Sequence, residues 1–456
     1  MSRRRSWLRH AGVAVALSAL SLAGCGGGGG KSDSQAQTVP KPGSAEAKSM
    51  TGEVSWWGWA PGPTVAPIYI KAFNEAYPNV KVTYKHFDYS GYSAALRTGV
   101  TSPSGPDIYN LQPGTITQAY GRFAADLTPA ARDALGTGWK DKLAPIGTES
   151  FTQNNRLLGL SIGSGAAGTL LINQSMFDKW GLKAPTTLDE WVQTCRTIQA
   201  KGTTCFVQGA KDEWINQDMI QSIANSIAPG KFRQAVDGKI PWTDPDLVQA
   251  LTVFKTLFSN GVMQPGAVGI QQYPDAMNRF LAGKAAMIMQ GSWEASQYDK
   301  DHLIASIKAA GVSNPTAFTA LLIPFPDVAG KGNASPLFAD ADFGLAVREQ
   351  SKNKTAATAF ASWLTTSTAG QKLVADQFVQ VPALKGVTPE MSGLVDPATQ
   401  TDSLKKILAD VSAATEHRQI ASSDLVTALG DAASAIATGK RSPQDAAADL
   451  QKAMPS

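Results

Sequence analysis

Residues 274–294 read PDAMNRFLAGKAAMIMQGSWE, and this stretch decides the class of fold. Residues 274–282 have the spacing of a helix, which Gly283 ends. Residues 285–289 form a short apolar run that predicts a buried strand. A Gly-Ser turn follows and places Trp293 at the carboxyl end of that strand, where open α/β sheets bind their ligands. The stretch therefore predicts an α/β protein with a ligand close to Trp293.

The same alternation of strands and helices continues in both directions. Residues 54–57 and 80–84 predict strands on either side of a helix that Pro78 ends. Residues 169–172 predict a further strand, and Thr187 begins a capping box that opens the next helix. Alternation of this kind favours α/β architecture, with helices covering the faces of the sheets.

Four segments carry a resemblance to a known family. They are GPDIY at 105–109; LIN at 171–173 with Phe177, Gly181-Leu182, Pro185-Thr186-Thr187 and Glu190-Trp191; FLAGKAAM at 280–287 with GSWE at 291–294; and Lys354, Ala356-Ala357, Phe360, Trp363-Leu364, Thr366 and Gly370-Gln371. In this order they resemble the extracellular solute-binding proteins of ABC importers, the sugar-binding group that includes maltose-binding protein. The resemblance covers about residues 52 to 456.

The resemblance implies a type II periplasmic-binding-protein fold: two α/β lobes with a hinge and a central ligand cleft. It implies a first lobe of residues 52–163 and 339–366 and a second lobe of residues 164–338 and 367–456, with chain crossings near 161–163, 338–340 and Thr366. It also implies a monomer that captures a mono- or oligosaccharide and delivers it to the permease subunits of an importer. Closure of the lobes about the hinge would trap the ligand.

The first residues predict export and a lipid anchor. Arg3, Arg4, Arg5 and Arg9 form a basic region ahead of a 12-residue apolar stretch, which is typical of a signal peptide over 1–24. Leu22-Ala23-Gly24-Cys25 resembles the lipobox of bacterial lipoproteins, which implies a lipid on Cys25 and an extracytoplasmic location at the cell membrane. Residues 4–9 also resemble a twin-arginine signal, and the Sec route remains open. Residues 25–51 are rich in glycine and polar residues, which predicts a flexible linker.

The charge of the remaining chain excludes some classes of partner. Removing the four arginines of the signal from the 41 basic residues leaves a basic count equal to the 37 acidic residues. A formal net charge of zero gives no reason to expect nucleic acid as a partner. Nothing in the sequence indicates a cofactor or a metal.

Cys195 and Cys205 are separated by nine residues in a chain that the signal directs out of the cytoplasm. Disulfides persist in such compartments, which favours a bond between them. Two buried thiols remain the alternative. No histidine is near in sequence, which argues against a metal site.

A sugar-binding site needs aromatic side chains for the faces of the ring and polar side chains for its hydroxyl groups. Trp180, Trp191 and Trp363 lie in helical patterns and are assigned to the core. Among Trp56, Trp57 and Trp59, which follow the first strand, we favour Trp57, because neighbours on a strand point to opposite faces. The predicted ligand-binding residues are Trp293, Glu294, Trp57, Trp56, Tyr89, Asp88, Gln112, Trp214, Gln217, Asp340 and Asp342.

Alternative functions have weaker support in the sequence. Residues 159–163 match the G-x-S-x-G elbow of hydrolases, but a helix must follow the serine directly, and a strand is expected there instead. Residues 163–168 match G-x-G-x-x-G, yet they are better explained as a small-residue loop between lobes. A binding protein of the same fold for a glycerophosphodiester, a polyol or an amino-acid-like anion remains open. An anion binder should carry arginines in its cleft.

Overall fold

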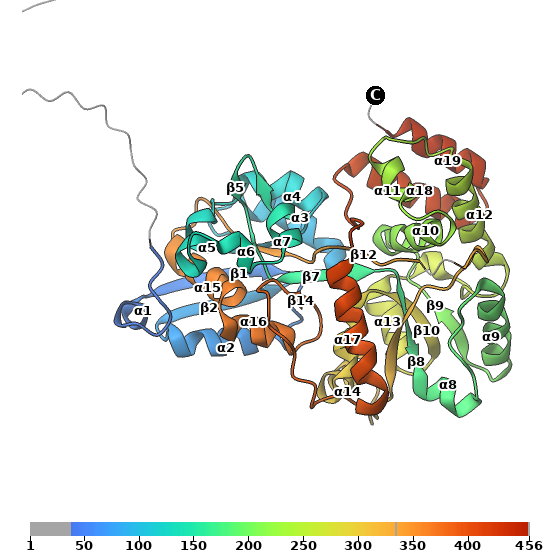
Figure 1. Ribbon diagram of the computed structural model, residues 1–456, viewed down its shortest axis with the longest axis horizontal. Coiled ribbons are helices and arrows are strands. Elements are labelled where there is room, and N and C mark those ends of the chain that lie inside the picture. Colours follow the sequence, from blue (N-terminus) through green and yellow to red (C-terminus); the bar gives the residue numbers. More distant parts are fainter. Residues whose placement is uncertain (1–37, 333–334, 455–456) are drawn as a thin grey trace, which may run out of the picture. The chain divides into compact units, whose positions relative to one another are not determined.

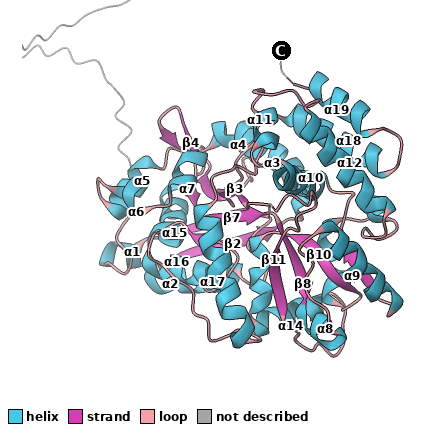
Figure 2. Ribbon diagram, turned by 45° about the vertical axis from the view of Figure 1, so that its right-hand side comes forward, coloured by secondary structure: helices cyan, strands magenta, loops and turns pink. Residues whose placement is uncertain are grey.

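Two mixed β-sheets organise the computed structural model, which describes residues 38–332 and 335–454 (Figure 1). The first has the order β2 (Val80–His86), β1 (Gly52–Gly58), β3 (Ile108–Leu111), β13 (Gly344–Val347) and β6 (Leu160–Ser161). The second has the order β11 (Ala320–Pro324), β8 (Thr169–Asn173), β10 (Ala285–Gln290) and β9 (Thr204–Val207). Helices surround each sheet (Figure 2), and each sheet with its helices is called a lobe below.

A third, three-stranded sheet joins the lobes, and we call it the hinge sheet. Its order is β12 (Phe338–Ala341), β7 (Gly163–Ala167) and β14 (Val381–Pro382), with β7 antiparallel to both neighbours. The chain thus passes between the lobes at three adjacent strands. The expectation of a loop at 163–168 was wrong: these small residues form a buried strand, because backbone hydrogen bonds to both sides replace side-chain packing.

The helical segments are divided between the lobes as follows. The first lobe has α1 (Ala45–Ser49), α2 (Ala66–Ala76), α3 (Tyr89–Gly99), α4 (Thr115–Tyr120), η1 (Gly121–Phe123), α5 (Thr128–Leu135), α6 (Trp139–Lys142), α7 (Pro145–Ser150), α15 (Lys354–Thr366) and α16 (Thr368–Ala375), with a small hairpin of β4 (Thr152–Gln153) and β5 (Arg156–Leu157). The second has α8 (Gln174–Trp180), α9 (Leu188–Ala200), α10 (Glu213–Ile227), α11 (Lys231–Val236), α12 (Pro245–Ser259), η2 (Ala267–Gly269), η3 (Gln272–Ala276), α13 (Met277–Leu281), η4 (Ser292–Tyr298), α14 (Lys300–Ala309), α17 (Pro397–Ala413), α18 (Ser423–Ala437) and α19 (Pro443–Lys452).

The core of the first lobe corrects one expected lobe boundary. Val374 of α16 is fully buried in this core, and Leu373 packs against it. Residues 367–375 therefore belong to the first lobe, not to the second. The last passage between lobes lies at β14, beyond the expected position at Thr366.

The central sheet of the second lobe is covered on both faces. Leu170 and Ile172 of β8 pack in one apolar cluster, whereas Leu171 between them packs in another. Met287 and Ile288 of β10 divide between the two clusters in the same way. Side chains alternate along a strand, so an unbroken apolar run is what a strand buried on both faces requires.

The residues ahead of β1 depart from the flexible linker expected through position 51. Ser44 caps the short helix α1 by accepting a hydrogen bond from the amide of Ala47, which is fully buried in the first-lobe core. The Tyr77 hydroxyl donates to the carbonyl oxygen of Pro40 at 2.6 Å. Residues 38–50 are thus part of the folded lobe. The signal peptide, Cys25 and the linker up to residue 37 lie outside the described residues.

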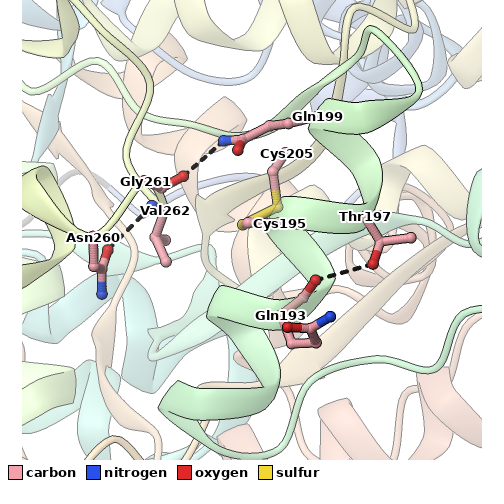
Figure 3. The surroundings of a disulfide bond; sticks show 8 residues. All are labelled: Gln193, Cys195, Thr197, Gln199, Cys205, Asn260, Gly261 and Val262. Carbon is pink, nitrogen blue, oxygen red and sulfur yellow. Dashed lines mark hydrogen bonds between the residues drawn. A yellow bond between two sulfur atoms is a disulfide. The ribbon is translucent and has the colours of Figure 1, made fainter.

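A disulfide joins Cys195 of α9 to Cys205 of β9, the pairing that the compartment favoured over two free thiols (Figure 3). Both cysteines are buried, and their Cα atoms are 4.9 Å apart. One helical turn further on, the Gln199 side chain donates to the carbonyl oxygen of Gly261 at 2.7 Å. The bond therefore lies inside the second lobe and fastens a helix to its edge strand.

Candidate functional site

Three aromatic side chains of the second lobe meet beyond the carboxyl end of β10. Trp214 and Tyr273 are stacked, with ring centroids 6.0 Å apart and planes inclined by 8°. Trp293 meets Trp214 edge-on, with centroids 6.2 Å apart. All three are partly exposed. Trp214, Tyr273 and Trp293 are called the aromatic cluster below.

The first lobe contributes aromatic side chains that approach this cluster. The ring of Tyr89, the first residue of α3, lies 6.0 Å from that of Trp214, centroid to centroid. Trp59, just beyond β1, packs edge-on against Tyr89 at 5.6 Å. The Gln271 side chain donates to the Ser90 hydroxyl at 3.3 Å, a second contact between lobes. The aromatic cluster therefore lies where the two lobes touch.

A hydrogen-bond network fixes the orientation of Trp293. Its indole N–H donates to the Tyr273 hydroxyl at 3.0 Å and is 3.2 Å from Oε1 of Gln290. The Tyr273 hydroxyl donates to Oε1 of Glu294 at 2.5 Å, and Gln297 donates to the other carboxylate oxygen at 3.1 Å. Glu294 is buried, and this burial raises its pKa. Both of its oxygens have protein donors, so Glu294 supports the aromatic cluster from below.

Trp293 also lies against the hinge sheet. A Cβ atom on Gly291 would approach Cζ3 of Trp293 to 2.1 Å and the carbonyl oxygen of Ala166 to 2.4 Å. No side chain fits there, so the glycine of the Gly-Ser turn is required by close approach. Gly165 of β7 is near the same indole. Trp293 and the hinge sheet are thus in direct contact.

An arginine lies over the aromatic cluster. The guanidinium carbon of Arg418 is 4.7 Å from the ring centroid of Trp293 and 5.6 Å from that of Trp214. Its Nε and Nη2 atoms each donate to a carboxylate oxygen of Asp218 at 2.9 Å. Asp218 is almost fully buried, and desolvation raises its pKa against the opposing charge of Arg418. Both partners of this ion pair are residues of the protein, and the Asp218 carboxylate is almost completely shielded from solvent.

Two polar side chains of the first lobe and the hinge region complete the site. Gln112, at the end of β3, is buried and accepts a hydrogen bond from the Tyr89 hydroxyl at 2.7 Å. Asp342, just beyond β12, accepts from Gln380 at 2.6 Å. Burial raises the pKa of Asp342, while the charge of Arg418 acts in the opposite direction.

The structure brings together part of the predicted set. Trp293, Trp214, Tyr89, Gln112 and Asp342 lie in or next to the aromatic cluster, with Glu294 beneath it. Gln217 and Asp340 instead hold the main chain at Arg418.

Three predicted residues lie elsewhere. Trp56 is fully buried, and its indole N–H donates to Asn110, so it belongs to the first-lobe core. Trp57 packs against Phe87 and under the amine of Lys85, away from the cluster. Asp88 is exposed at the start of α3. The favoured residue, Trp57, was wrong because β1 continues to Gly58, which leaves Trp59 as the first tryptophan beyond the strand.

Sequence reasoning missed Tyr273, Arg418, Asp218 and the role of Trp59. Tyr273 comes directly before Pro274, in a segment treated only as a helix start. Asp218 lies on the helix that also carries Gln217 and points into the lobe. Arg418 lies between α17 and α18 in no recognisable motif. The detectable signal was the position of Trp59, Tyr89 and Trp293 shortly after the ends of strands. No sequence pattern indicated the ion pair of Asp218 and Arg418.

The hydrolase motif does not form a nucleophile elbow. The Ser161 hydroxyl donates to the carbonyl oxygen of Gly163 at 3.2 Å, and strand β7 follows where the elbow requires a helix. Within residues 38–332 and 335–454, no cluster of three or more metal-ligating acids, histidines and cysteines occurs. Over the same residues, no helix has the length and apolar character needed to cross a membrane.

Comparisons with known proteins place the chain among binding proteins. The family model described as bacterial extracellular solute-binding protein matches residues 56–371. The multiple sugar-binding protein of Streptococcus mutans is 24% identical over 343 residues, which are 73% of this chain and 74% of that protein. The xylose/arabinose-binding protein XacG of Haloferax volcanii is 23% identical over 57% of each chain.

Solved structures share the fold. A structure from a study of xylan utilization by Caldanaerobius polysaccharolyticus has a TM-score of 0.73 at 22% identity, covering 88% of this chain and 100% of the other. Maltose-bound MalE3 of T. maritima has a TM-score of 0.70 at 20% identity, covering 88% and 98%. The expected two-lobe type II fold is confirmed.

Proposed function

We propose a ligand class for this chain, which belongs to the bacterial extracellular solute-binding protein family: it captures a carbohydrate between its lobes for an ABC importer. The family consists of binding proteins, and its members act outside the cytoplasm. What we propose beyond the family is that the ligand is a carbohydrate, either a mono- or an oligosaccharide. Delivery to permease subunits follows from the type of importer that such proteins serve.

The observation that carries the proposal is the aromatic cluster. Trp214, Tyr273 and Trp293 offer flat apolar faces at the junction of the lobes, and polar side chains surround them. The C–H faces of a sugar ring pack on such surfaces, while carboxylate, amide and guanidinium groups match its hydroxyl groups. Relatives named for binding multiple sugars and for xylose and arabinose support the same class.

The charges near the cluster favour a neutral solute over an anion. Arg418 is the cation over the cluster, and its charge is already balanced by Asp218. Asp342 and Glu294 add two carboxyl groups near the cluster. A ligand phosphate or carboxylate would meet more acids than bases here, which costs affinity.

Export and anchoring belong to the same proposal. The signal peptide over 1–24 would direct export and be removed, and a lipid on Cys25 would then hold a monomeric binding protein at the outer face of the cell membrane. The protein would need no cofactor and would release its ligand unchanged. Ser161 in a strand, without a helix after it, supports binding without hydrolysis.

Thermal melting of the purified protein tests the ligand class. The panel is maltotriose, xylotriose, raffinose and N-acetylchitotriose, with glycerol 3-phosphate and glutamate as anionic alternatives. A compound that binds only the folded state raises the melting temperature as its concentration increases. We expect a shift with at least one saccharide and none with the anions.

Matched tryptophan variants locate the binding. Trp293→Ala removes an aromatic platform and should weaken saccharide binding about tenfold, from lost stacking and lost apolar area. Trp180→Ala removes a partly buried tryptophan at the end of α8, outside the site, and should keep the wild-type affinity. A shift only with glycerol 3-phosphate or glutamate would overturn the carbohydrate assignment.

A further inference from the structure

Residues 416–420 run beside the hinge sheet, and we call them the hinge-bound segment. Ala339 of β12 donates its amide to the carbonyl oxygen of Glu416 at 2.8 Å, and Phe338 forms a parallel bridge with the same residue. The segment thus lies along the edge of the strand by which the chain returns to the first lobe. Movement of that strand must be accompanied by movement of these residues.

One buried carboxylate fixes the segment to the strand. Oδ2 of Asp340 accepts from the amides of Arg418 and Gln419, at 3.0 Å and 2.7 Å. Its Oδ1 is 2.7 Å from Nδ1 of His417. Asp340 is only 5% exposed, so these bonds are made in a poorly solvated environment where each is strengthened. They determine the position from which the Arg418 side chain starts.

Both lobes also contact the segment. Gln217 of α10 donates to the carbonyl oxygen of Arg418 at 2.9 Å, and Gln221 donates to the Glu416 carboxylate at 2.7 Å. From the first lobe, a Cβ atom at Gly114 would be 2.7 Å from the carbonyl oxygen of Ile420. The segment therefore lies at the junction of the second lobe, the first lobe and the hinge.

The Arg418 side chain has donors that none of the described residues accepts. A guanidinium carries five N–H groups, and the pairing with Asp218 takes one from Nε and one from Nη2. Within residues 38–332 and 335–454, Nη1 has no acceptor at hydrogen-bond distance. The side chain is only 12% exposed, and the guanidinium lies over Trp293. Its remaining donors are thus held at the aromatic cluster.

We propose that Arg418 is a ligand-binding residue and that Asp340 positions it. The remaining N–H groups of Arg418 donate to an oxygen atom of the solute at the aromatic cluster, and Asp340 ties this contact to the hinge sheet. The contact with ligand and the hinge strand then move as one unit, so ligand binding favours one arrangement of the lobes. The inference deepens the proposed function, because it concerns the same site.

Calorimetric titration of Arg418 variants tests the contact. The titrant is the panel compound, sugar or anion, with the largest wild-type melting shift, so the inference is judged even where the carbohydrate assignment fails. Arg418→Met keeps an unbranched apolar stem but removes the guanidinium, which leaves Asp218 buried without a partner. The double variant Asp218→Asn with Arg418→Met removes both charges and should regain stability. We expect at least tenfold weaker binding in both variants.

The opposite result has a defined meaning. Arg418 lies over Trp293, so it could merely cover the platform until a ligand displaces it. In that case the double variant, with the cover removed, would bind the titrant as tightly as the wild type or more tightly. That outcome would overturn the assignment of Arg418 as a ligand contact.

Asp340→Asn tests positioning, with His417→Gln as its control. The asparagine has nearly the same size, but it loses the charge and one acceptor oxygen that hold the segment. We expect several-fold weaker binding and a shifted tryptophan emission in the unliganded protein, because Trp293 and Trp214 lie under Arg418. His417→Gln leaves both amide bonds to Asp340 and should change affinity less than twofold. An Asp340→Asn protein that melts lower but keeps wild-type affinity and emission would show a structural role only.

Discussion

The aromatic cluster around Trp293 and the apolar group around Trp191, both in the second lobe, differ in their surroundings. Trp191 of α9 is fully buried and meets Phe206 and Phe325 edge-on, at 5.1 Å and 5.8 Å between ring centroids. Its indole N–H has no hydrogen-bond partner among the described residues. Trp293 is partly exposed, and two acceptors lie within reach of its indole N–H. One cluster is made of apolar contacts, and the other is embedded in polar groups.

The difference separates stability from binding. Apolar burial stabilises the Trp191 cluster enough to tolerate a buried N–H that lacks a partner, which costs about 1–3 kcal/mol. The cluster at Trp293 lies beside an ion pair and two further carboxyl groups, an arrangement that favours specificity over stability. Substitutions in the first should lower stability, and substitutions in the second should lower affinity.

The largest effect is expected at Trp191. Trp191→Ala should lower the free energy of unfolding by about 3–5 kcal/mol, because it leaves a large cavity in a close-packed core. Trp191→Phe, which keeps a ring and removes the unpaired N–H, should lose much less. Chemical unfolding followed by fluorescence measures both. Weakened saccharide binding by Trp191→Ala at temperatures where it remains folded would break the division between the clusters.

The next largest effect is expected at the disulfide, and like that of Trp191 it concerns stability rather than affinity. Cys195 lies one helical turn from Trp191, and Cys205 precedes Phe206, so the bond reinforces the apolar cluster. Replacing both cysteines by serine should lower the free energy of unfolding by about 2–3 kcal/mol, from the conformational freedom that a short closed loop denies the unfolded chain. Calorimetric titration should find saccharide affinity unchanged. A parallel loss of affinity would mean that the two clusters are coupled.

The smallest effect concerns protonation near the site. The hydrogen bond to Asp340 raises the pKa of His417, although Arg233 acts against it and Glu149 supports it. The folded state then binds the proton more tightly, so the stabilisation is complete below the unfolded pKa of about 6.5 and disappears as pH rises through the higher folded value. His417→Gln should therefore melt slightly lower than the wild type at about pH 5.5 and equally at about pH 8.5.

His302 provides the control of opposite sign. Burial lowers its pKa, so the folded state favours its neutral form. As pH falls below about 6.5, protonation of His302 in the unfolded chain should destabilise the wild type. His302→Gln should therefore gain melting temperature relative to the wild type at acid pH but not at alkaline pH. The same sign for both variants would contradict the local origin of the two pKa shifts.

The sequence predicted the fold well where periodicity was strong. The expected strands at 54–57, 80–84, 169–172 and 285–289 lie within β1, β2, β8 and β10. It failed at β7, where Gly163–Ala167 offers no apolar pattern and the strand is held by backbone hydrogen bonds from two distant segments. It also failed at residues 38–50, where the Tyr77 hydroxyl, 37 positions away, holds the carbonyl oxygen of Pro40.

The site was predictable to the extent that it follows strand ends. Gln112 directly follows β3, and Trp293 lies shortly after the end of β10. Tyr89 begins the helix after β2. Choosing Trp59 instead of Trp57 would have required the end of β1 to be known within one residue. Asp218 and Arg418 are 200 positions apart, and only the folded chain brings them into one ion pair.

The contact between Trp293 and β7 has a mechanical consequence. A rigid body that rotates about an axis moves least close to that axis and most at its far edge. Gly165 of the hinge sheet lies against the indole, so solute would bind close to the pivot. A slight difference in the shape of the solute at this point would become a large displacement at the outer rims of the lobes. The molecule would thus act as a lever, whose short arm senses the solute and whose long arm presents the outcome to whatever docks there.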